Sequence, residues 1–192
     1  MANQGKMIDA TEYSDRYTGL LELLISGYYD AFMLQAIDEI RPESKDYVGV
    51  SFKMLRHISE LLKRDLALVI WRIYFDPDSK ANTIRQLNGY LRKNGVETHQ
   101  RLSLSNKSLE KELDEARNSF LAHNDAKKSK VSIEIVDLNN ALDEIRLMLN
   151  GLCFPEIDSG VFQLTDQMKY KLSFEAKVGF GLLIQGYAGK KE

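Results

Sequence analysis

The stretch YSDRYTGLLELLISGYYDAFML, residues 13–34, decides the fold class because its apolar side chains recur at steps of three and four residues. That spacing places them along one face of an α-helix. We therefore predict one long helix from about Ile8 to Ile40, with the aromatic side chains of this face in the core. The face consists of Tyr13, Tyr17, Leu20, Leu21, Leu24, Tyr28, Ala31 and Leu34.

Similar spacing recurs in segments that prolines separate. Pro42, Pro77 and Pro155 each follow an apolar stretch, which is typical of boundaries between helices. A second long helix is expected from about Tyr47 to Phe75, with a broadly apolar and therefore buried end. Further helices are expected over about 82–93, 105–128, 138–152 and 166–185. Together these segments predict an all-α fold, an up-and-down bundle of four to six helices.

Particular residues mark where these helices begin and end. Asp78 and Ser79 are suitable N-caps for the 82–93 helix, and Asn94-Gly95 is a C-cap signal. VSIEIV, residues 131–136, alternates like a strand, but one such segment cannot form a sheet, so we predict an extended linker there with Asp137 as the next N-cap. We assign residues 1–154 to the bundle and 155–192 to a C-terminal helix, packed on the bundle or on a partner, with a flexible end.

Composition limits the functions that the chain can have. Its 192 residues are 44% hydrophobic and 28% charged, which is typical of a folded globular protein. A net charge of -2 gives no general attraction to nucleic acid, so RNA binding would need a local patch such as the lysines of residues 127–130. The single Cys153, the lack of a secretory signal and the lack of a long apolar run predict a cytoplasmic protein that does not cross a membrane. No metal-ligand spacing occurs, so no cofactor is expected.

The stretch ARNSFLAHND, residues 116–125, carries the strongest chemical signal. Leu109, Leu113, Ala116 and Phe120 form the apolar face of the predicted helix, and His123 occupies the next position of that series. Arg117 lies on the other edge of the face, about 120° away around the axis. One helix cannot easily direct both groups at one atom, whereas two copies about a two-fold axis can, which predicts a dimeric site.

An arginine and a histidine together suit chemistry at a phosphate. The arginine fork binds phosphate oxygens bidentately, and histidine can both accept and donate a proton near neutral pH. RNA cleavage uses these two functions and needs no metal. The alternative is structural: the histidine is packed at the helix margin, and Arg117 is a solvated partner of Glu112, Asp114 or Glu115.

These residues resemble the signature of the HEPN superfamily (higher eukaryotes and prokaryotes nucleotide-binding), in which a polar residue follows an arginine and a histidine comes a few residues later. Here five residues, Asn118–Ala122, separate Arg117 from His123. RNSFLAHND, followed by a basic linker and preceded by LVIWRIYFDPDSK, is similar to the abortive-infection branch found in bacterial phage defence. The resemblance covers about residues 10–152.

The resemblance implies a helical bundle, a homodimer that brings two motifs together, and a toxin-like, metal-independent endoribonuclease that an antitoxin or regulatory protein could control. Arg117 would hold the scissile phosphate and His123 would be the general base or acid. Asn118 matches the polar position, and Asn124 lies about 20° from Arg117 around the helix. The remaining expected RNA contacts are Lys127 and Lys128. The alternative within the superfamily is a non-catalytic module that binds a protein partner or a nucleotide.

Overall fold

The computed structural model describes residues 8–40, 52–77, 82–98, 102–122 and 133–188. Within these ranges the chain forms six helices and no strand, which confirms the predicted all-α class. The helices are α1 (Ala10–Ile40), α2 (Phe52–Tyr74), α3 (Ile84–Lys93), α4 (Ser108–Ala122), α5 (Ile135–Asn150) and α6 (Asp166–Ala188).

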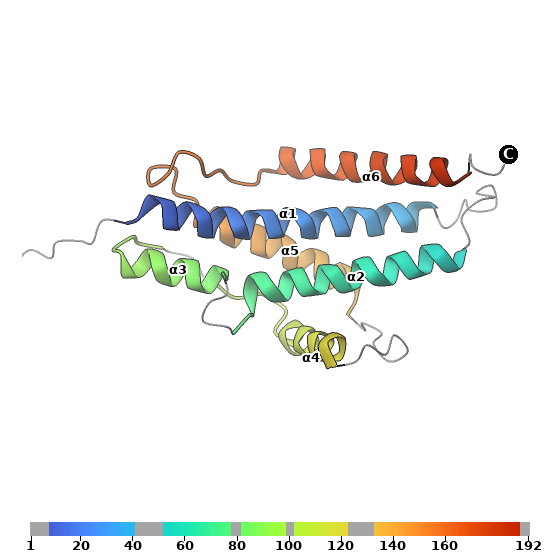
Figure 1. Ribbon diagram of the computed structural model, residues 1–192. Helices are drawn as coiled ribbons and strands as arrows, with labels where there is room; N and C mark the ends of the chain where they lie inside the picture. The colour runs from blue at the N-terminus through green and yellow to red at the C-terminus, as the bar shows by residue number, and fades with distance from the viewer. Residues whose placement is uncertain (1–7, 41–51, 78–81, 99–101, 123–132, 189–192) are drawn as a thin grey trace, which may run out of the picture.

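Helix α1 is the centre of the bundle, in contact with α2, α3, α5 and α6. Figure 1 shows α6, α1 and α2 running side by side, with α4 on the side of α2 that faces away from α1. Chain direction reverses between α1 and α2 and again between α5 and α6 (Figure 1). The short helices α3 and α4 lie between these two antiparallel pairs in the sequence. Helix α4 therefore lies at the edge of the bundle.

The predicted apolar face of α1 forms the core. Tyr13, Tyr17, Leu20 and Leu24 are fully buried, and Tyr28 is nearly so. The phenol hydroxyls are paired, as buried polar groups must be: the Tyr13 hydroxyl donates to the Leu152 carbonyl oxygen at 2.9 Å. Burial raises the pKa of Tyr13 to about 12. These tyrosines are thus core aromatics with satisfied hydroxyls.

Helix α1 crosses its neighbours closely at one glycine. A Cβ atom added to Gly27 would lie 3.0 Å from the Leu142 side chain of α5 and 3.1 Å from the Val69 side chain of α2. Both separations are shorter than ordinary van der Waals contact. Gly27 therefore allows three helices to meet at one point.

Helix α1 also qualifies as a membrane span by length and composition, over Ala10–Glu39. The sequence interpretation, which looked for uninterrupted apolar runs, missed this. Of the apolar window, 56% is buried inside the bundle. The core helix of a globular protein meets the same criterion, because it too is long and apolar.

The start of α3 differs from the sequence prediction. Helix α3 begins after Thr83, whose hydroxyl accepts the backbone N–H of Gln86 while the Gln86 side chain accepts the N–H of Thr83. This capping box takes the place predicted for Asp78 and Ser79, which lie outside the described residues. The predicted end is confirmed, because Asn94 is the C-cap and Gly95 has a φ of 85°.

The segment predicted as an extended linker is partly helical. Helix α5 begins at Ile135, and its cap position is Glu134 rather than Asp137. Ile133 is buried in the core, so its packing fixes the start of the helix before the predicted cap is reached. Asp137 instead lies in the first turn, where a negative charge interacts favourably with the helix dipole.

A polar cluster attaches the first half of α6 to the bundle. Asp143 of α5 accepts hydrogen bonds from the Tyr28 hydroxyl and the Lys169 ammonium, both at 2.5 Å. Burial alone would raise the pKa of Asp143, but the bonds from Lys169 and Tyr28 outweigh it and leave the pKa below its ordinary value. Arg146 adds an ion pair to Asp166 at 2.8 Å. The C-terminal helix therefore packs against α1 and α5 of its own chain.

Candidate functional site

The predicted arginine lies over the chain's only tryptophan. The Cζ atom of Arg117, on α4, is 4.4 Å from the centroid of the Trp71 ring, on α2. The indole N–H of Trp71 donates to Oδ1 of Asp114 at 3.1 Å. Because residues three apart on a helix lie on the same side, α4 holds the indole by its edge with Asp114 and covers its face with Arg117. We call these three residues the indole clasp.

The clasp restrains the guanidinium without burying it. Trp71 is 6% exposed, so the ring is a fixed platform, whereas Arg117 remains partly exposed. Nη1 of Arg117 donates to Oδ1 of Asn118 at 3.3 Å, and no ion pair joins Arg117 to any other described residue. Among the described residues its N–H donors have no further hydrogen bond, and a planar cation held in place loses less conformational entropy when it binds an anion.

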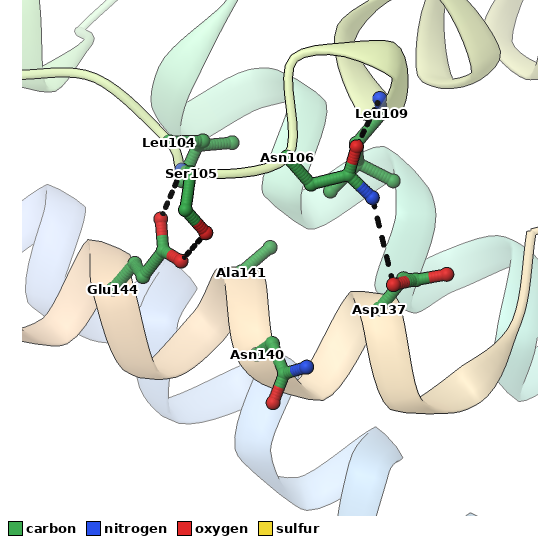
Figure 2. Close-up of a pocket in the computed structure, with 8 residues that line it drawn as sticks. All are labelled: Leu104, Ser105, Asn106, Leu109, Asp137, Asn140, Ala141 and Glu144. Atoms are coloured by element: carbon green, nitrogen blue, oxygen red, sulfur yellow. Dashed lines mark hydrogen bonds between the residues drawn. The ribbon is translucent and has the colours of Figure 1, made fainter.

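Hydrogen bonds among the polar residues that line a hollow of about 320 Å³ between α4 and α5 fix the start of α4. Figure 2 shows Asn106 at its edge, with Oδ1 accepting the backbone N–H of Leu109 and Nδ2 donating to Asp137. The Ser105 hydroxyl and backbone N–H both donate to Glu144 (Figure 2). Because these polar groups bond to one another, they attach the start of α4 to α5. This attachment also explains why the helix begins at Ser108 and not at Ser105 as predicted.

A second pocket lies beside the clasp, between α4 and the end of α2. Its volume is about 540 Å³. Two lysines and two acids give it mixed charge, and Asp114 belongs to both the pocket and the clasp. Asn118 lies on the same side of α4, since it follows Lys111 and Asp114 at steps of seven and four. The pocket is lined by Phe75, Pro77, Lys107, Glu110, Lys111 and Asp114.

Of the predicted site residues, the structure describes two. Arg117 belongs to the clasp, and Asn118 accepts a hydrogen bond from it on the side of α4 that faces the pocket. The described part of the apolar face beneath them is as predicted: Leu109 and Leu113 are buried and Ala116 packs against the core, while the Phe120 side chain lies outside the described part of the chain. The other predicted residues, His123, Asn124, Lys127 and Lys128, lie outside the described residues, and His123 directly follows the last residue of α4.

The acids considered as partners for Arg117 have another arrangement. Asp114 accepts the indole N–H of Trp71, and Glu115 lies 3.8 Å from the Lys111 ammonium. The purely structural role expected for Arg117 was an ion pair with one of these acids. Within the described residues Arg117 instead covers the Trp71 ring.

The sequence interpretation did not identify Trp71 and Asp114 as parts of the site. One signal was available: a buried indole N–H needs a hydrogen-bond acceptor, and the only tryptophan lies near the end of the second predicted helix. Cys153 is buried, and the described residues contain no group of three or more side chains suited to hold a metal ion.

Compared with models of protein families, with curated proteins and with solved structures, the chain matches none. Its function is therefore argued from the residues of the site.

Proposed function

We propose that this chain is a metal-independent endoribonuclease of the HEPN type, with a composite site formed by two copies. Arg117 binds the scissile phosphate and His123 transfers protons. The observation that supports this proposal best is the restrained, partly exposed guanidinium of Arg117, which lies 4.4 Å from the Trp71 ring and one turn from a pocket. An arginine that served only to neutralise a nearby acid would pair with that acid and would not need to lie over a tryptophan ring.

The chemistry requires three actions at one phosphate. A base removes the proton of the ribose 2′-hydroxyl, the 2′-oxygen attacks the phosphorus, and an acid protonates the 5′-oxygen as it leaves. The products are a 2′,3′-cyclic phosphate and a free 5′-hydroxyl. Negative charge grows on the phosphate oxygens during attack, and the fork of Arg117 stabilises it through paired N–H donors.

A second copy supplies what one helix cannot. On a continuous helix the direction of His123 is about 120° from that of Arg117. A two-fold axis close to the end of α4 would bring the histidine of one chain near the arginine of the other. Asn118 then orients Arg117 from the same chain, and Asn124, Lys127 and Lys128 contact the RNA backbone beside it. The resemblance to the abortive-infection branch makes phage defence the expected role, with an antitoxin or regulatory protein as partner.

The test is cleavage of total RNA in the presence of EDTA. Wild-type protein should cut RNA and leave 2′,3′-cyclic ends, whereas His123→Ala and Arg117→Ala should each lose about 100-fold or more of the rate. Arg92→Ala, at an exposed arginine of α3, is the matched control and should keep full activity. Cleavage that EDTA abolishes, or that survives both site substitutions, would show the mechanism to be wrong.

The second candidate is a non-catalytic module that binds a nucleotide or a protein. The pocket of about 540 Å³ beside the clasp favours it, since Lys107 and Lys111 could pair with phosphates. The emission of Trp71, the only tryptophan, offers a direct assay. Saturable quenching by ATP in a protein that cleaves no RNA, lost in Lys107→Ala, would support the binding module. Absence of any response to ATP together with RNA cleavage would reject it.

A further inference from the structure

Helix α6 is apolar on the face that packs on the bundle and also on the face that points away from it. Ala176 and Phe180 are each 3% exposed on the inner face. The outer face carries four large side chains: Tyr170 is 75%, Phe174 62%, Val178 43% and Leu182 65% exposed. Outer Phe174 is about 200° around the axis from inner Ala176, so the two faces are nearly opposite. An apolar face of a helix normally lies against another element, so the second face of α6 calls for a partner.

We propose that the outer face of α6, comprising Tyr170, Phe174, Val178 and Leu182, binds the same face of a second copy of this chain in antiparallel orientation. The sizes of its residues point to this partner. About a two-fold axis level with Ala176, Phe174 lies opposite the smaller Val178 of the second copy, and Tyr170 lies opposite Leu182. Large residues facing smaller ones pack without gaps. A parallel pair would instead place Phe174 against Phe174.

The free space near the end of α6 fits the same orientation. A Cβ atom added to Gly179 or Gly181 would meet no atom within 4 Å. In the antiparallel pair Gly181 is level with Lys171 of the second copy, whose long side chain can lie across the glycine with its ammonium in water.

The exposed area is sufficient for a modest dimer. With a fully exposed aromatic side chain presenting about 150–250 Å², and valine and leucine less, the four exposed fractions correspond to roughly 400 Å² for each chain. A pair would then bury about 800 Å², which is the size of weak, transient interfaces. We therefore expect weak, reversible association, with a dissociation constant of tens of micromolar or more, on the order of that of transient complexes.

The charges beside this face favour a second copy over a membrane surface. Lys171, which lies between Val178 and Leu182 around the axis, is 3.8 Å from Glu175, so the two charges are balanced. Lys177, on one flank of the face, is already paired with Glu39 at 2.7 Å. A helix that lies on anionic lipid normally has unpaired lysines and arginines on both flanks. A self-complementary neutral face is instead suited to an isologous interface.

This interface is different from the one in the proposed ribonuclease, and does not depend on it. Figure 1 shows α6 and α4 on opposite sides of the bundle, with α1 and α2 between them. Pairing through α6 therefore leaves the two Arg117 side chains far apart. If both interfaces form, each chain has two isologous contacts, and the smallest closed assembly contains four copies.

Sedimentation velocity of the full chain over a micromolar concentration range tests the interface. The wild type should form a reversible dimer. The double variant Phe174→Ser with Val178→Ser should raise the dissociation constant at least tenfold, because it removes the centre of the face. Leu147→Ser is the matched control, at a leucine of α5 that is 59% exposed, and should leave the dissociation constant unchanged. Since these side chains point outward, circular dichroism should be the same for all three proteins, and their melting temperatures should agree at concentrations well below the dissociation constant, where no dimer adds stability.

A cysteine cross-link tests the orientation. In a Cys153→Ala background, mixing the single variants Phe174→Cys and Val178→Cys should give mixed disulfide dimers faster than either variant alone gives its own dimer. A monomeric wild type, or a dimer that the double serine variant does not weaken, would overturn the proposal. Faster cross-linking of the Phe174→Cys variant with itself would overturn the antiparallel orientation.

Discussion

Replacing Asp114 by alanine should destabilise the folded chain because it leaves the indole N–H of Trp71 without its acceptor. That bond is 3.1 Å long, and Trp71 is only 6% exposed. An unpaired buried donor costs about 1–3 kcal/mol, and the lower half of that range applies here because the bond is only partly buried. Alanine recovers up to about 0.5 kcal/mol through its higher helix propensity. The expected net loss in the free energy of unfolding is about 1 kcal/mol, which lowers the melting temperature by about 2–4 °C.

A double-mutant cycle with Arg117→Ala tests whether the clasp acts as a unit. The loss of the cation over the ring should cost about 0.5–1 kcal/mol. Asp114 fixes the plane on which Arg117 rests, so the second substitution should cost less once the first has been made. We expect the double variant to lose about 0.5 kcal/mol less than the sum of the two single variants.

Urea unfolding followed by Trp71 emission measures these changes, because the chain's only tryptophan belongs to the clasp. Asp15→Ala is the matched control: Asp15 is an exposed residue of α1, so the substitution gives the same gain in helix propensity and removes no indole bond. If Asp114→Ala is as harmless as Asp15→Ala, or if the two clasp substitutions are additive, then Asp114 and Arg117 do not hold the indole jointly.

Two further predictions concern the bundle itself. Burial, followed by the charge of Asp65, raises the pKa of Asp30 from 3.8 to about 7. Between these values the folded chain holds a proton that the unfolded chain has released, so stability falls as pH rises. Asp30→Asn should remove this slope in urea titrations and gain about 1–2 kcal/mol near pH 7, after allowance for solvent screening; an unchanged slope would contradict the assignment. Gly27→Ala should destabilise by about 1 kcal/mol, since overpacking exceeds the gain in helix propensity. Gly89→Ala, with open space around its Cβ, should stabilise by about 0.5–1 kcal/mol, and equal melting temperatures would contradict both expectations.

The fold class could be predicted because burial depends on a repeating pattern. The aromatic and aliphatic residues of α1 that recur at helical spacing are the residues that the core contains, and period alone identifies such a face. Helix ends were harder to predict, because they depend on single residues with competitors close by. Thr83 caps α3 through reciprocal hydrogen bonds with Gln86. Asp78 and Ser79 are equally good caps by residue type, so the choice among the three depends on where the chain enters the core.

The candidate site was only partly predictable. Arg117 was identified by its spacing to His123 in a pattern that resembles a family signature, which neighbouring residues of one segment reveal. The clasp depends on contact between α4 and α2, 43 residues apart in sequence at Trp71 and Asp114. Nothing local determines which of several acids receives the indole N–H, so Asp114 was considered only as a partner for Arg117.

The clasp bears directly on how Arg117 substitutions should be interpreted. Because Arg117 contacts Trp71 through its guanidinium, Arg117→Ala removes both a structural contact and the proposed phosphate ligand. Arg117→Lys keeps a cation that can lie over the ring but loses the paired donors that bind phosphate in two places. If Arg117 only supports the bundle, the lysine variant should restore most of the stability, and RNA cleavage should recover with it. If Arg117 binds the scissile phosphate, stability should recover while the rate of cleavage stays low. The lysine variant thus separates the two roles, which the alanine variant cannot do.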